Sequence, residues 1–425
     1  MMVMDFFNKI VFPRKSKYKI MLVIIDGLAD IPIEGLGNQT PLEVAKTPNL
    51  DKIASRGQSG MLWPYIPWTP LGSGPAHLAL LGYDPLKNYV GRGPLEALGF
   101  EIPTDEGDVI IRLNFATIDE ETRMVVDRRA GRIETELTKK LFEYINDNME
   151  HEPSQFPGIS WKIHNTRGYR GVICLGNASS WIDGSDPRGF EKVRTIKNMK
   201  DDEVSIRTAK FMNWFLNETH QLLRDHPINR ERIKNGLPPA NHLLSRGAGK
   251  IEYPVPFAEK YKFENPVFIS GYPLYSGLAR FLDIEIQKPD TPNINAKFKK
   301  ASELFPEHDI VILHIKDPDI AGEDGNPVSK IKMLEEIDLG FKYILDILTP
   351  EDTIIITADH ATPAKIMDHS GHPVPILAWG PYTGHDDVTK FSEKECAKGS
   401  LGMFASSYMM NLALMITLRM KTFGA

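Results

Sequence analysis

The amino-acid sequence predicts an α/β protein with a three-layer core, in which helices cover both faces of a mainly parallel sheet. Short apolar runs without polar alternation are typical of strands buried on both faces. Helical patterns alternate with these runs at both ends of the chain, as βα folds require. The middle of the 425-residue chain has a different pattern and predicts an inserted α+β domain.

Four apolar runs are predicted to be the buried strands of the core: Ile20–Ile25, Ile310–Ile315, Thr353–Thr357 and Val374–Trp379. A helix is expected over residues 47–56, with Thr47 as the candidate cap, Pro48 at the first helical position and Gly57 as the stop. Residues 330–348 carry apolar side chains at three- and four-residue spacing, which predicts a second helix.

The predicted insertion runs from residue 88 to residue 257. It contains strand-like segments at Val109–Ala116 and Val172–Leu175 and one long helical pattern at Asp202–Arg224. Proline- and glycine-containing breakers follow that helix.

Composition excludes several classes of protein. The net charge of −6, from 50 basic and 56 acidic residues, argues against a nucleic-acid binder, which normally carries a basic surplus. Cys174 and Cys396 are the only cysteines, which excludes a disulfide framework, makes a zinc–thiolate site improbable and favours a cytoplasmic location.

The first nineteen residues predict a simple N-terminal extension. They lack the uninterrupted apolar centre and the cleavage site of a signal peptide. The alternative is a weak amphipathic membrane contact through Phe6, Phe7, Ile10, Val11 and Phe12. Because no run of about 20 apolar residues occurs in the chain, no integral membrane segment is expected.

Acidic side chains follow three of the predicted strands. Asp26 follows the first, Asp319 follows the second, and Asp359-His360 follows the third, with His369 on the next loop. Carboxylate and imidazole together suit a divalent cation such as Zn²⁺ or Mn²⁺. The alternatives are ordinary polar loops and, for the acidic turn after Asp319, a Ca²⁺ loop, although the EF-hand order of ligands is absent.

Ser73 stands between two glycines, and Pro75 marks a possible helix start just after it. A hydroxyl at a helix N-terminus lies where free N–H groups favour a phosphate, and a nearby metal would make it a nucleophile. The alternative is an ordinary turn. The acidic residues after three strands, the nearby histidines and the serine at a helix start are together consistent with phosphoryl transfer through a phosphoserine.

Several motifs resemble the archaeal-type, 2,3-bisphosphoglycerate-independent phosphoglycerate mutases of the alkaline phosphatase superfamily. The matching segments are Asp26-Gly27, Thr40-Pro41-Leu42-Glu43, Gly72-Ser73, Gly91-Arg92-Gly93-Pro94-Leu95-Glu96, Asp127-Arg128-Arg129, Arg246-Gly247-Ala248-Gly249 and Asp359-His360 with His369. The resemblance covers nearly the whole chain from about residue 18.

This resemblance implies an alkaline-phosphatase-like core formed by residues 20–87 and 258–425, with a substrate-binding domain at 88–257. It implies two divalent metal ions, with Mn²⁺ as the expected ion and Mg²⁺, Zn²⁺ or Co²⁺ as alternatives. One site would use Asp26, Ser73, Asp359 and His360, and the other Asp319, Glu323 and His369. Ser73 would carry the phosphoryl group. A small phosphorylated acid would be held by residues from the set Arg92, Asp127, Arg128, Arg132, Arg170, Asp183, Asp186 and Lys316, since arginine binds phosphate and carboxylate in two places at once.

The chain departs from the family pattern near the expected chemistry. Glu323 replaces a histidine ligand, and further differences fall at Gly74, Tyr169, Arg188, Ser276, His372, Met403 and Ala405. We therefore consider three functions: a phosphoglycerate mutase, a phosphatase or phosphotransferase for another small phosphorylated metabolite, and a catalytically impaired regulatory relative.

Overall fold

The computed structural model describes residues 11–424, and these divide into two compact units. Unit 1 comprises residues 1–89 and 253–425, and unit 2 comprises residues 90–252. The break points lie within a few residues of the boundaries expected from the sequence. That unit 2 serves as a substrate domain stays a prediction.

Unit 1 is built on an eight-stranded sheet with the order β10-β9-β11-β2-β12-β13-β3-β14. Only β13 runs against its neighbours among the strands described, so the predicted mainly parallel sheet is confirmed. The strands are β10 (Glu285–Gln287), β9 (Pro266–Ile269), β11 (Ile310–Ile315), β2 (Ile20–Ile25), β12 (Thr353–Thr357), β13 (Val374–Trp379), β3 (Gln58–Trp63) and β14 (Gly402–Ala405).

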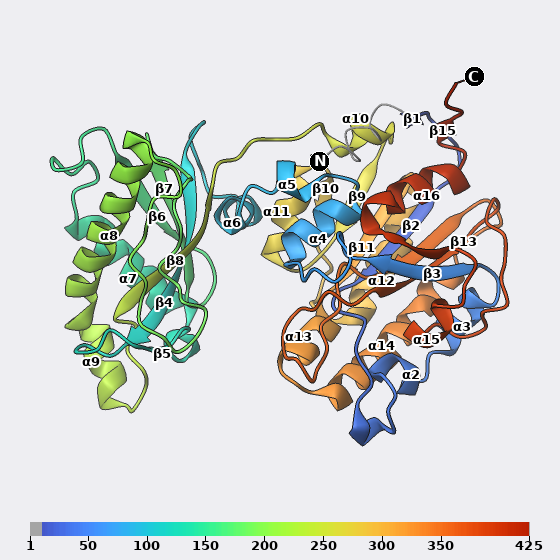
Figure 1. Ribbon diagram of the computed structural model, residues 1–425, viewed down its shortest axis with the longest axis horizontal. Helices are drawn as coiled ribbons and strands as arrows, with labels where there is room; N and C mark the ends of the chain where they lie inside the picture. The colour runs from blue at the N-terminus through green and yellow to red at the C-terminus, as the bar shows by residue number, and fades with distance from the viewer. Residues whose placement is uncertain (1–10, 425) are drawn as a thin grey trace. The chain divides into compact units, whose positions relative to one another are not determined.

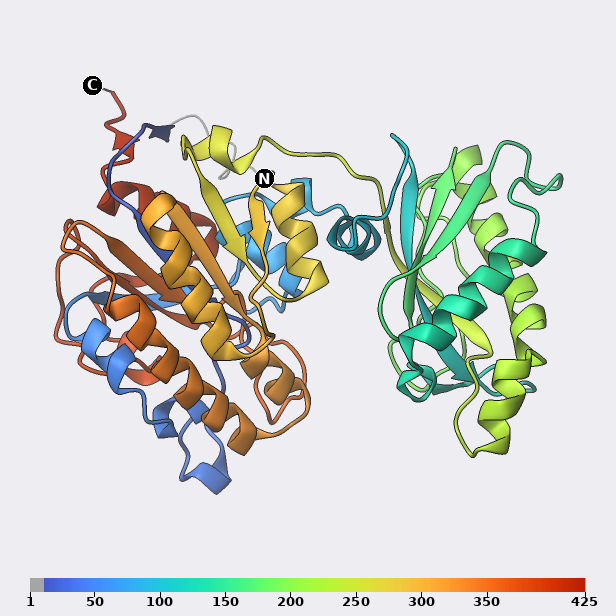
Figure 2. The ribbon, with the colours of Figure 1, turned by 180° about the vertical axis from the view of Figure 1, so that it is seen from behind.

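Helices cover both faces of this sheet and produce the predicted three layers. Figure 1 shows three of them in front of the sheet: α4 (Ser73–Leu80), α11 (Pro273–Phe281) and α16 (Met409–Ile416). Figure 2 shows two long helices on the opposite face: α12 (Ile294–Leu304) and α14 (Pro327–Leu345). The four predicted core strands have the bounds expected, and every residue of β2, β11 and β12 is buried.

Two details of the predicted helices are wrong. The helix α3 (Pro48–Ala54) begins at Pro48 as expected, but the Thr47 side chain makes no capping hydrogen bond. Its backbone has φ −123° and ψ 57°, away from the extended conformation in which a capping hydroxyl reaches the first turn. Helix α4 begins at Ser73, two residues before Pro75.

Unit 2 is an antiparallel five-stranded sheet with helices on both faces, which matches the predicted α+β character. Strand β4 pairs with β5, β7 and β8, and β7 pairs with β6. The strands are β4 (Val109–Ile118), β5 (Val125–Asp127), β6 (Ser160–Asn165), β7 (Arg170–Gly176) and β8 (His242–Gly249).

Alternation along β4 assigns its two faces. Val109, Ile111, Leu113 and Phe115 belong to the core beneath α7 (Thr135–Asn148) and α8 (Glu203–Arg224). Ile110 packs instead with Ala97 of α6 (Arg92–Gly99) on the opposite face. Figure 1 shows α7 and α8 on one side of this sheet and α6 on the other.

The predicted extension joins unit 1 by pairing with the end of the chain. Strand β1 (Phe12–Pro13) pairs with β15 (Met420–Lys421), and the Phe12 and Phe423 rings stack with centroids 6.3 Å apart. Phe6, Phe7 and Ile10, named above for a membrane contact, lie outside the described residues. Within residues 11–424, no helix is long and apolar enough to cross a bilayer.

Candidate metal and phosphoryl-transfer site

The acidic residues predicted at strand ends meet at one edge of the unit 1 sheet. Asp26 follows β2, Asp359 follows β12 by one residue, and Asp319 lies in α13 (Asp317–Glu323) directly after β11. Strands β11 and β12 both pair in parallel with β2, so their carboxyl ends lie side by side. This is the edge where open α/β sheets bind ligands.

His360 links two groups of potential metal ligands. Asp26, Asp359 and His360 form one group, and Asp319, His360 and His369 form the other. The Nε2 atom of His360 lies 3.4 Å from Asp26 Oδ1 and 3.2 Å from Asp359 Oδ2, and its ring stacks on His369 with centroids 3.7 Å apart. The two groups are therefore adjacent, as in two-metal sites for phosphoryl transfer.

The carboxylates of the first group are buried and lack enough hydrogen-bond donors, as expected of a site that binds a cation. Asp26, Asp359 and His360 are fully buried, and Asp26 Oδ1 and both Asp359 oxygens accept no hydrogen bond among the described residues. Buried carboxylate oxygens without donors are costly unless a cation satisfies them. Burial also lowers the pKa of His360, which favours the neutral imidazole that a metal requires.

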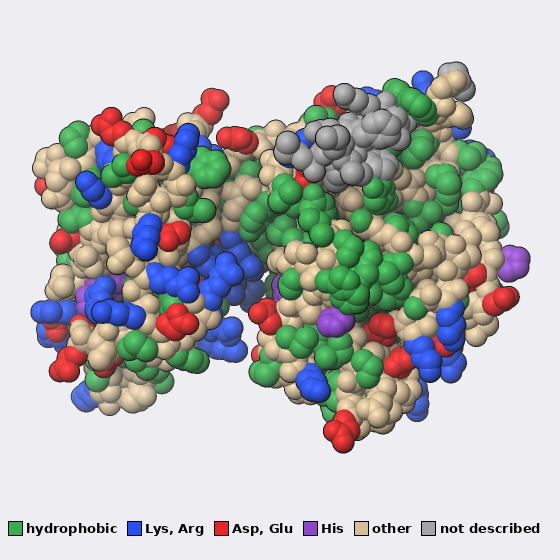
Figure 3. Space-filling model, viewed as in Figure 1, with side chains coloured by type: hydrophobic (Ala, Val, Ile, Leu, Met, Phe, Trp, Pro, Cys, Tyr) green, Lys and Arg blue, Asp and Glu red, His purple; other side chains and the backbone are tan. Residues whose placement is uncertain are grey.

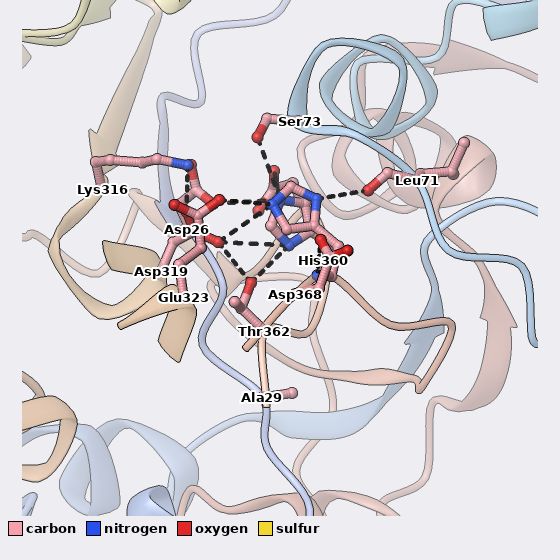
Figure 4. Close-up of polar contacts among 12 residues, drawn as sticks. Asp26, Ala29, Leu71, Ser73, Lys316, Asp319, Glu323, His360, Thr362 and Asp368 are labelled. Atoms are coloured by element: carbon pink, nitrogen blue, oxygen red, sulfur yellow. Dashed lines mark hydrogen bonds and ion pairs between the residues drawn. The ribbon is translucent and has the colours of Figure 1, made fainter. Parts of the chain in front are cut away.

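Ser73 lies beside this group at the first position of α4. Its Oγ is 3.3 Å from His360 Nε2, and its side chain is buried. Because Gly72 is the N-cap, the first backbone N–H groups of α4 have no partner within the helix. Figure 4 shows Ser73 approaching the cluster from a different side than Lys316.

Lys316 supplies a positive charge at the same edge. Its Nζ pairs with Asp319 and lies 3.1 Å from Asp26 Oδ2. Burial on its own would lower the pKa of Lys316, but Asp26, Tyr275 and Asp319 raise it well above the usual value. The pKa of Asp26 moves the opposite way: burial raises it, while Lys316, His314 and His360 outweigh that effect and hold it well below its ordinary value.

Glu323 is placed less closely than the other predicted ligands. Its Oε1 lies 3.8 Å from His369 Nε2, its side chain is half exposed, and it belongs to neither compact ligand group. His369 has a closer neighbour in Asp319, at 3.5 Å. The site at Asp319 is thus less complete than the site at Asp26.

Four side chains around the cluster were not expected as part of the site. His77 Nδ1 lies 3.1 Å from Asp359 and 2.9 Å from the Ser73 carbonyl, and His314 Nε2 lies 3.0 Å from Asp26. The Tyr275 hydroxyl donates to Asp26, and the Thr362 hydroxyl donates to Asp319. A polar residue inside an otherwise apolar run was the available signal for His77 and His314.

Arginines from three strands and one helix gather in unit 2. Arg112 of β4 faces Arg246 of β8 in the sheet register, Arg170 begins β7, and Arg92 begins α6. Arg128 and Arg188 complete what we call the arginine cluster: Arg92, Arg112, Arg128, Arg170, Arg188 and Arg246. Figure 3 shows Lys and Arg side chains gathered on one part of unit 2.

This cluster contains more positive charge than its carboxylates balance. Glu96 pairs with Arg112 at 3.1 Å, and Asp186 makes a two-pronged pair with Arg128 at 3.0 and 2.7 Å. The Nε atoms of Arg170 and Arg246 have no hydrogen-bond partner in the described chain. Burial lowers the pKa of Arg112 to about 9, and the other arginines add to that effect. Such a cluster attracts an anion.

Other residues predicted to bind substrate have different neighbours. Asp127 accepts hydrogen bonds from the backbone of Arg129 and Gly131, and Asp183 accepts one from the backbone of Lys197. Arg132 lies at the end of that turn, with φ 55°. Arg112 was missed, although a charged residue in the middle of a buried strand could have identified it.

The matches to known proteins agree with this geometry. Residues 54–229 match the family model described as 2,3-bisphosphoglycerate-independent phosphoglycerate mutase. A protein of that name from Methanopyrus kandleri is 38% identical over 96% of this chain and 98% of its own. Another from Thermococcus gammatolerans is 41% identical over 96% of this chain and 100% of its own. This chain belongs to that family, whose members are isomerases.

Solved structures support the same assignment. A protein from Pyrococcus horikoshii has a TM-score of 0.81 and 33% identity, covering 97% of this chain and 100% of its own. The cofactor-independent phosphoglycerate mutase from Thermoplasma acidophilum has a TM-score of 0.65 and 33% identity, covering 94% of this chain and 100% of its own. The resemblance drawn from the sequence motifs is therefore confirmed at the level of family.

Proposed function

We propose that this chain interconverts 3-phosphoglycerate and 2-phosphoglycerate by phosphoryl transfer through Ser73, with two divalent metal ions. The observation that carries the proposal is the position of Ser73 Oγ, 3.3 Å from the histidine shared by the two ligand groups. Family membership at 38–41% identity supports the choice of substrate.

In this proposal Ser73 Oγ attacks the phosphorus of the bound phosphoglycerate. A bond forms between Oγ and phosphorus while the ester bond to the substrate oxygen breaks. The proton lost by the Ser73 hydroxyl is balanced by the proton that the departing oxygen takes up, so the substrate leaves with a hydroxyl at that carbon. The other hydroxyl of the glycerate then attacks the phosphoserine, and Ser73 Oγ departs. The N-terminus of α4 favours the anionic phosphoryl group throughout.

The proposed metal ligands are those expected from the resemblance. Asp26, Ser73, Asp359 and His360 would hold one ion, and Asp319, Glu323 and His369 the other. Bound divalent cations supply charge neutralisation and lower the pKa of the serine hydroxyl. The mixture of carboxylate and imidazole suits Mn²⁺ best, with Mg²⁺, Zn²⁺ and Co²⁺ as alternatives.

Lys316 and the arginine cluster would neutralise the charge of the substrate. Because its pKa is raised, Lys316 stays protonated at neutral pH and can stabilise charge that builds up on the phosphoryl oxygens. Arg92, Arg128 and Arg170 are the predicted substrate ligands that belong to the arginine cluster. We add Arg112 and Arg246 to them, since they share that excess of positive charge.

The test is a phosphorus NMR assay of the purified protein with Mn²⁺ and 3-phosphoglycerate. We expect 2-phosphoglycerate to appear without release of inorganic phosphate, and we expect Ser73→Ala to abolish the conversion. Mass spectrometry of quenched protein should find a phosphoryl group on the Ser73 peptide. Release of phosphate with no isomerisation would overturn the mutase assignment.

A second candidate function is hydrolysis of a different small phosphorylated metabolite. It is favoured by the looser placement of Glu323 and by Met403, which is 51% exposed at a position where the resemblance expects arginine. A panel of phosphorylated metabolites assayed for phosphate release would show one strongly preferred substrate under this alternative. The same panel would show negligible release if the chain is a mutase.

We also propose that the reaction takes place in the cytoplasm. Cys174 and Cys396 are both buried free thiols, and burial raises the pKa of each to about 12. Two unpaired thiols are usual in a reducing compartment. Fractionation of cells that express the chain at its natural level would test this location.

A further inference from the structure

A cavity lies in unit 1, and none of the proposed metal ligands lines it. It has a volume of about 450 Å³, within the range of small-molecule sites. Its walls come from Val11 and Pro13, from the loop that follows α4, from α5 (Pro85–Asn88), from α10 (Phe257–Tyr261) and the segment before it, and from the start of α16 and the residues just before it. The proposed phosphoryl transfer does not use these residues.

Lys260 places a positive charge in this cavity. Its Nζ donates to the carbonyl of Gly82 at 2.5 Å and lies 4.0 Å from the centroid of the Tyr83 ring. No carboxylate pairs with Lys260 among residues 11–424, and burial lowers its pKa to about 8. An ammonium has three donors, and the carbonyl of Gly82 accepts only one of them.

The rest of the lining offers flat apolar surfaces and further polar groups. Tyr83 and Tyr261 lie beside Lys260, and Pro254 and Val255 add an apolar edge. The side chains of Ser407 and Asn411 also line the cavity and make no hydrogen bond to the part of the chain that the structure describes. Lys87 and Asp84 line the cavity as well, and Asp84 Oδ1 accepts hydrogen bonds from the Tyr65 hydroxyl and the Leu86 backbone N–H. The cavity therefore combines two lysines, one carboxylate with its own donors, neutral hydrogen-bonding groups and aromatic walls.

We propose that this cavity binds a small organic anion that has a carboxylate and a flat apolar body. The carboxylate would pair with the Lys260 ammonium, and the body would pack on the tyrosine and proline surfaces. An amide or hydroxyl on the ligand would find partners in Ser407 and Asn411. Pairing with an anion would satisfy donors that the protein itself leaves without acceptors.

The cavity borders both segments through which the chain passes between the two units. Lys87 and Asn88 lie just before the chain enters unit 2, and Pro254 and Val255 lie just after it leaves. Tyr83 holds the returning segment through a hydrogen bond from its hydroxyl to the Val255 carbonyl, at 2.8 Å. A ligand in the cavity would contact the chain next to both connections between the units, at residues 87–88 and 254–255.

Indole-3-acetate is a suitable probe, with indole-3-acetamide as its neutral match. Isothermal titration of the full-length protein should show that the carboxylate binds roughly tenfold more tightly than the amide. Lys260→Met should remove this preference, whereas Lys332→Met, which alters an exposed lysine, should retain it. Ser73→Ala should also retain it, because the probe does not occupy the metal edge.

A measurement on the unmodified chain guards against a variant that fails to fold. Reductive methylation followed by peptide mass mapping should label Lys260, and indole-3-acetate should slow that labelling severalfold while the amide does not. Equal binding of the two probes, no binding of either, or Lys260 labelling that indole-3-acetate leaves unchanged would each overturn the proposal.

Discussion

The metal edge of unit 1 and the arginine cluster of unit 2 have opposite charge imbalances. At the metal edge, buried carboxylates retain oxygens that accept no hydrogen bond. In the arginine cluster, Glu96 and Asp186 balance only part of the charge of six arginines. The metal edge therefore attracts a cation, and the arginine cluster attracts an anion.

This difference separates two jobs that a phosphoryl-transfer enzyme must do. Carboxylate oxygens and histidine nitrogens that lack hydrogen-bond partners suit cations that activate a nucleophile. Arginines with free N–H groups suit the carboxylate and phosphate of a substrate. Changes in the first region should alter metal content together with turnover, while changes in the second should alter substrate affinity alone.

The largest effect should come from Asp359→Asn. Loss of this buried carboxylate removes a proposed metal ligand next to Ser73, so we expect turnover to fall by about a thousandfold and one metal ion to be lost. Elemental analysis and steady-state kinetics on the same preparation measure both. Asp324→Asn, an exposed neighbour of the site, is the control. Full metal content in Asp359→Asn would place the cation elsewhere.

Arg246→Met should act on affinity and leave the metal edge unchanged. Its nearest carboxylate, Asp186, is 4.0 Å away and keeps its pair with Arg128, so the change leaves no carboxylate stranded. We expect KM to rise roughly tenfold to a hundredfold with unchanged metal content. Arg224→Met, on the exposed end of α8, should leave KM as it is. A KM unaffected by Arg246→Met would remove Arg246 from the substrate site.

Glu323→His tests why the second metal site is less complete. A histidine would restore the ligand expected from the family resemblance. We therefore expect the ion at the Asp319 site to bind about tenfold more tightly. Dialysis followed by elemental analysis would show two ions retained in place of one. A variant that loses both ions at the rate of the unaltered chain would show that Glu323 already serves as a full ligand.

The smallest effect should come from Thr362→Val. The Thr362 hydroxyl donates to Asp319 and lies 3.1 Å from His360 Nδ1, so it orients ligands without binding the metal itself. We expect metal affinity to fall by roughly threefold to tenfold. Thr357→Val provides the matched control, because that hydroxyl bonds only the Pro375 carbonyl. Equal losses in both variants would indicate a general packing effect.

Sequence reasoning found the residues that follow directly from strand order. Asp26, Asp319 and Asp359 each come after a short, wholly buried strand rich in apolar residues, and parallel strands bring such positions to one edge. The family motifs added Ser73 and several arginines. Both predictions depend on local sequence patterns, which can be recognised without knowing where the side chains point.

Residues whose role depends on three-dimensional packing were not predictable in this way. His314 and Arg112 lie within apolar strands and become polar neighbours of the two sites only through the sheet register. The carboxylates of Asp127 and Asp183 accept hydrogen bonds from backbone amides in local turns, which the motifs do not reveal, and their role as substrate ligands stays a prediction. Thr47 occupies the capping position with a backbone conformation that prevents the capping bond.

The most direct test of the account is a crystal structure of the protein grown with Mn²⁺, with anomalous scattering to locate the metal. We expect one peak among Asp26, Ser73, Asp359 and His360, and a second among Asp319, Glu323 and His369. Peaks at both places would establish that the buried carboxylates and the shared histidine hold two cations beside the nucleophile. No peak at the Ser73 position in a protein that still turns over phosphoglycerate would contradict the account.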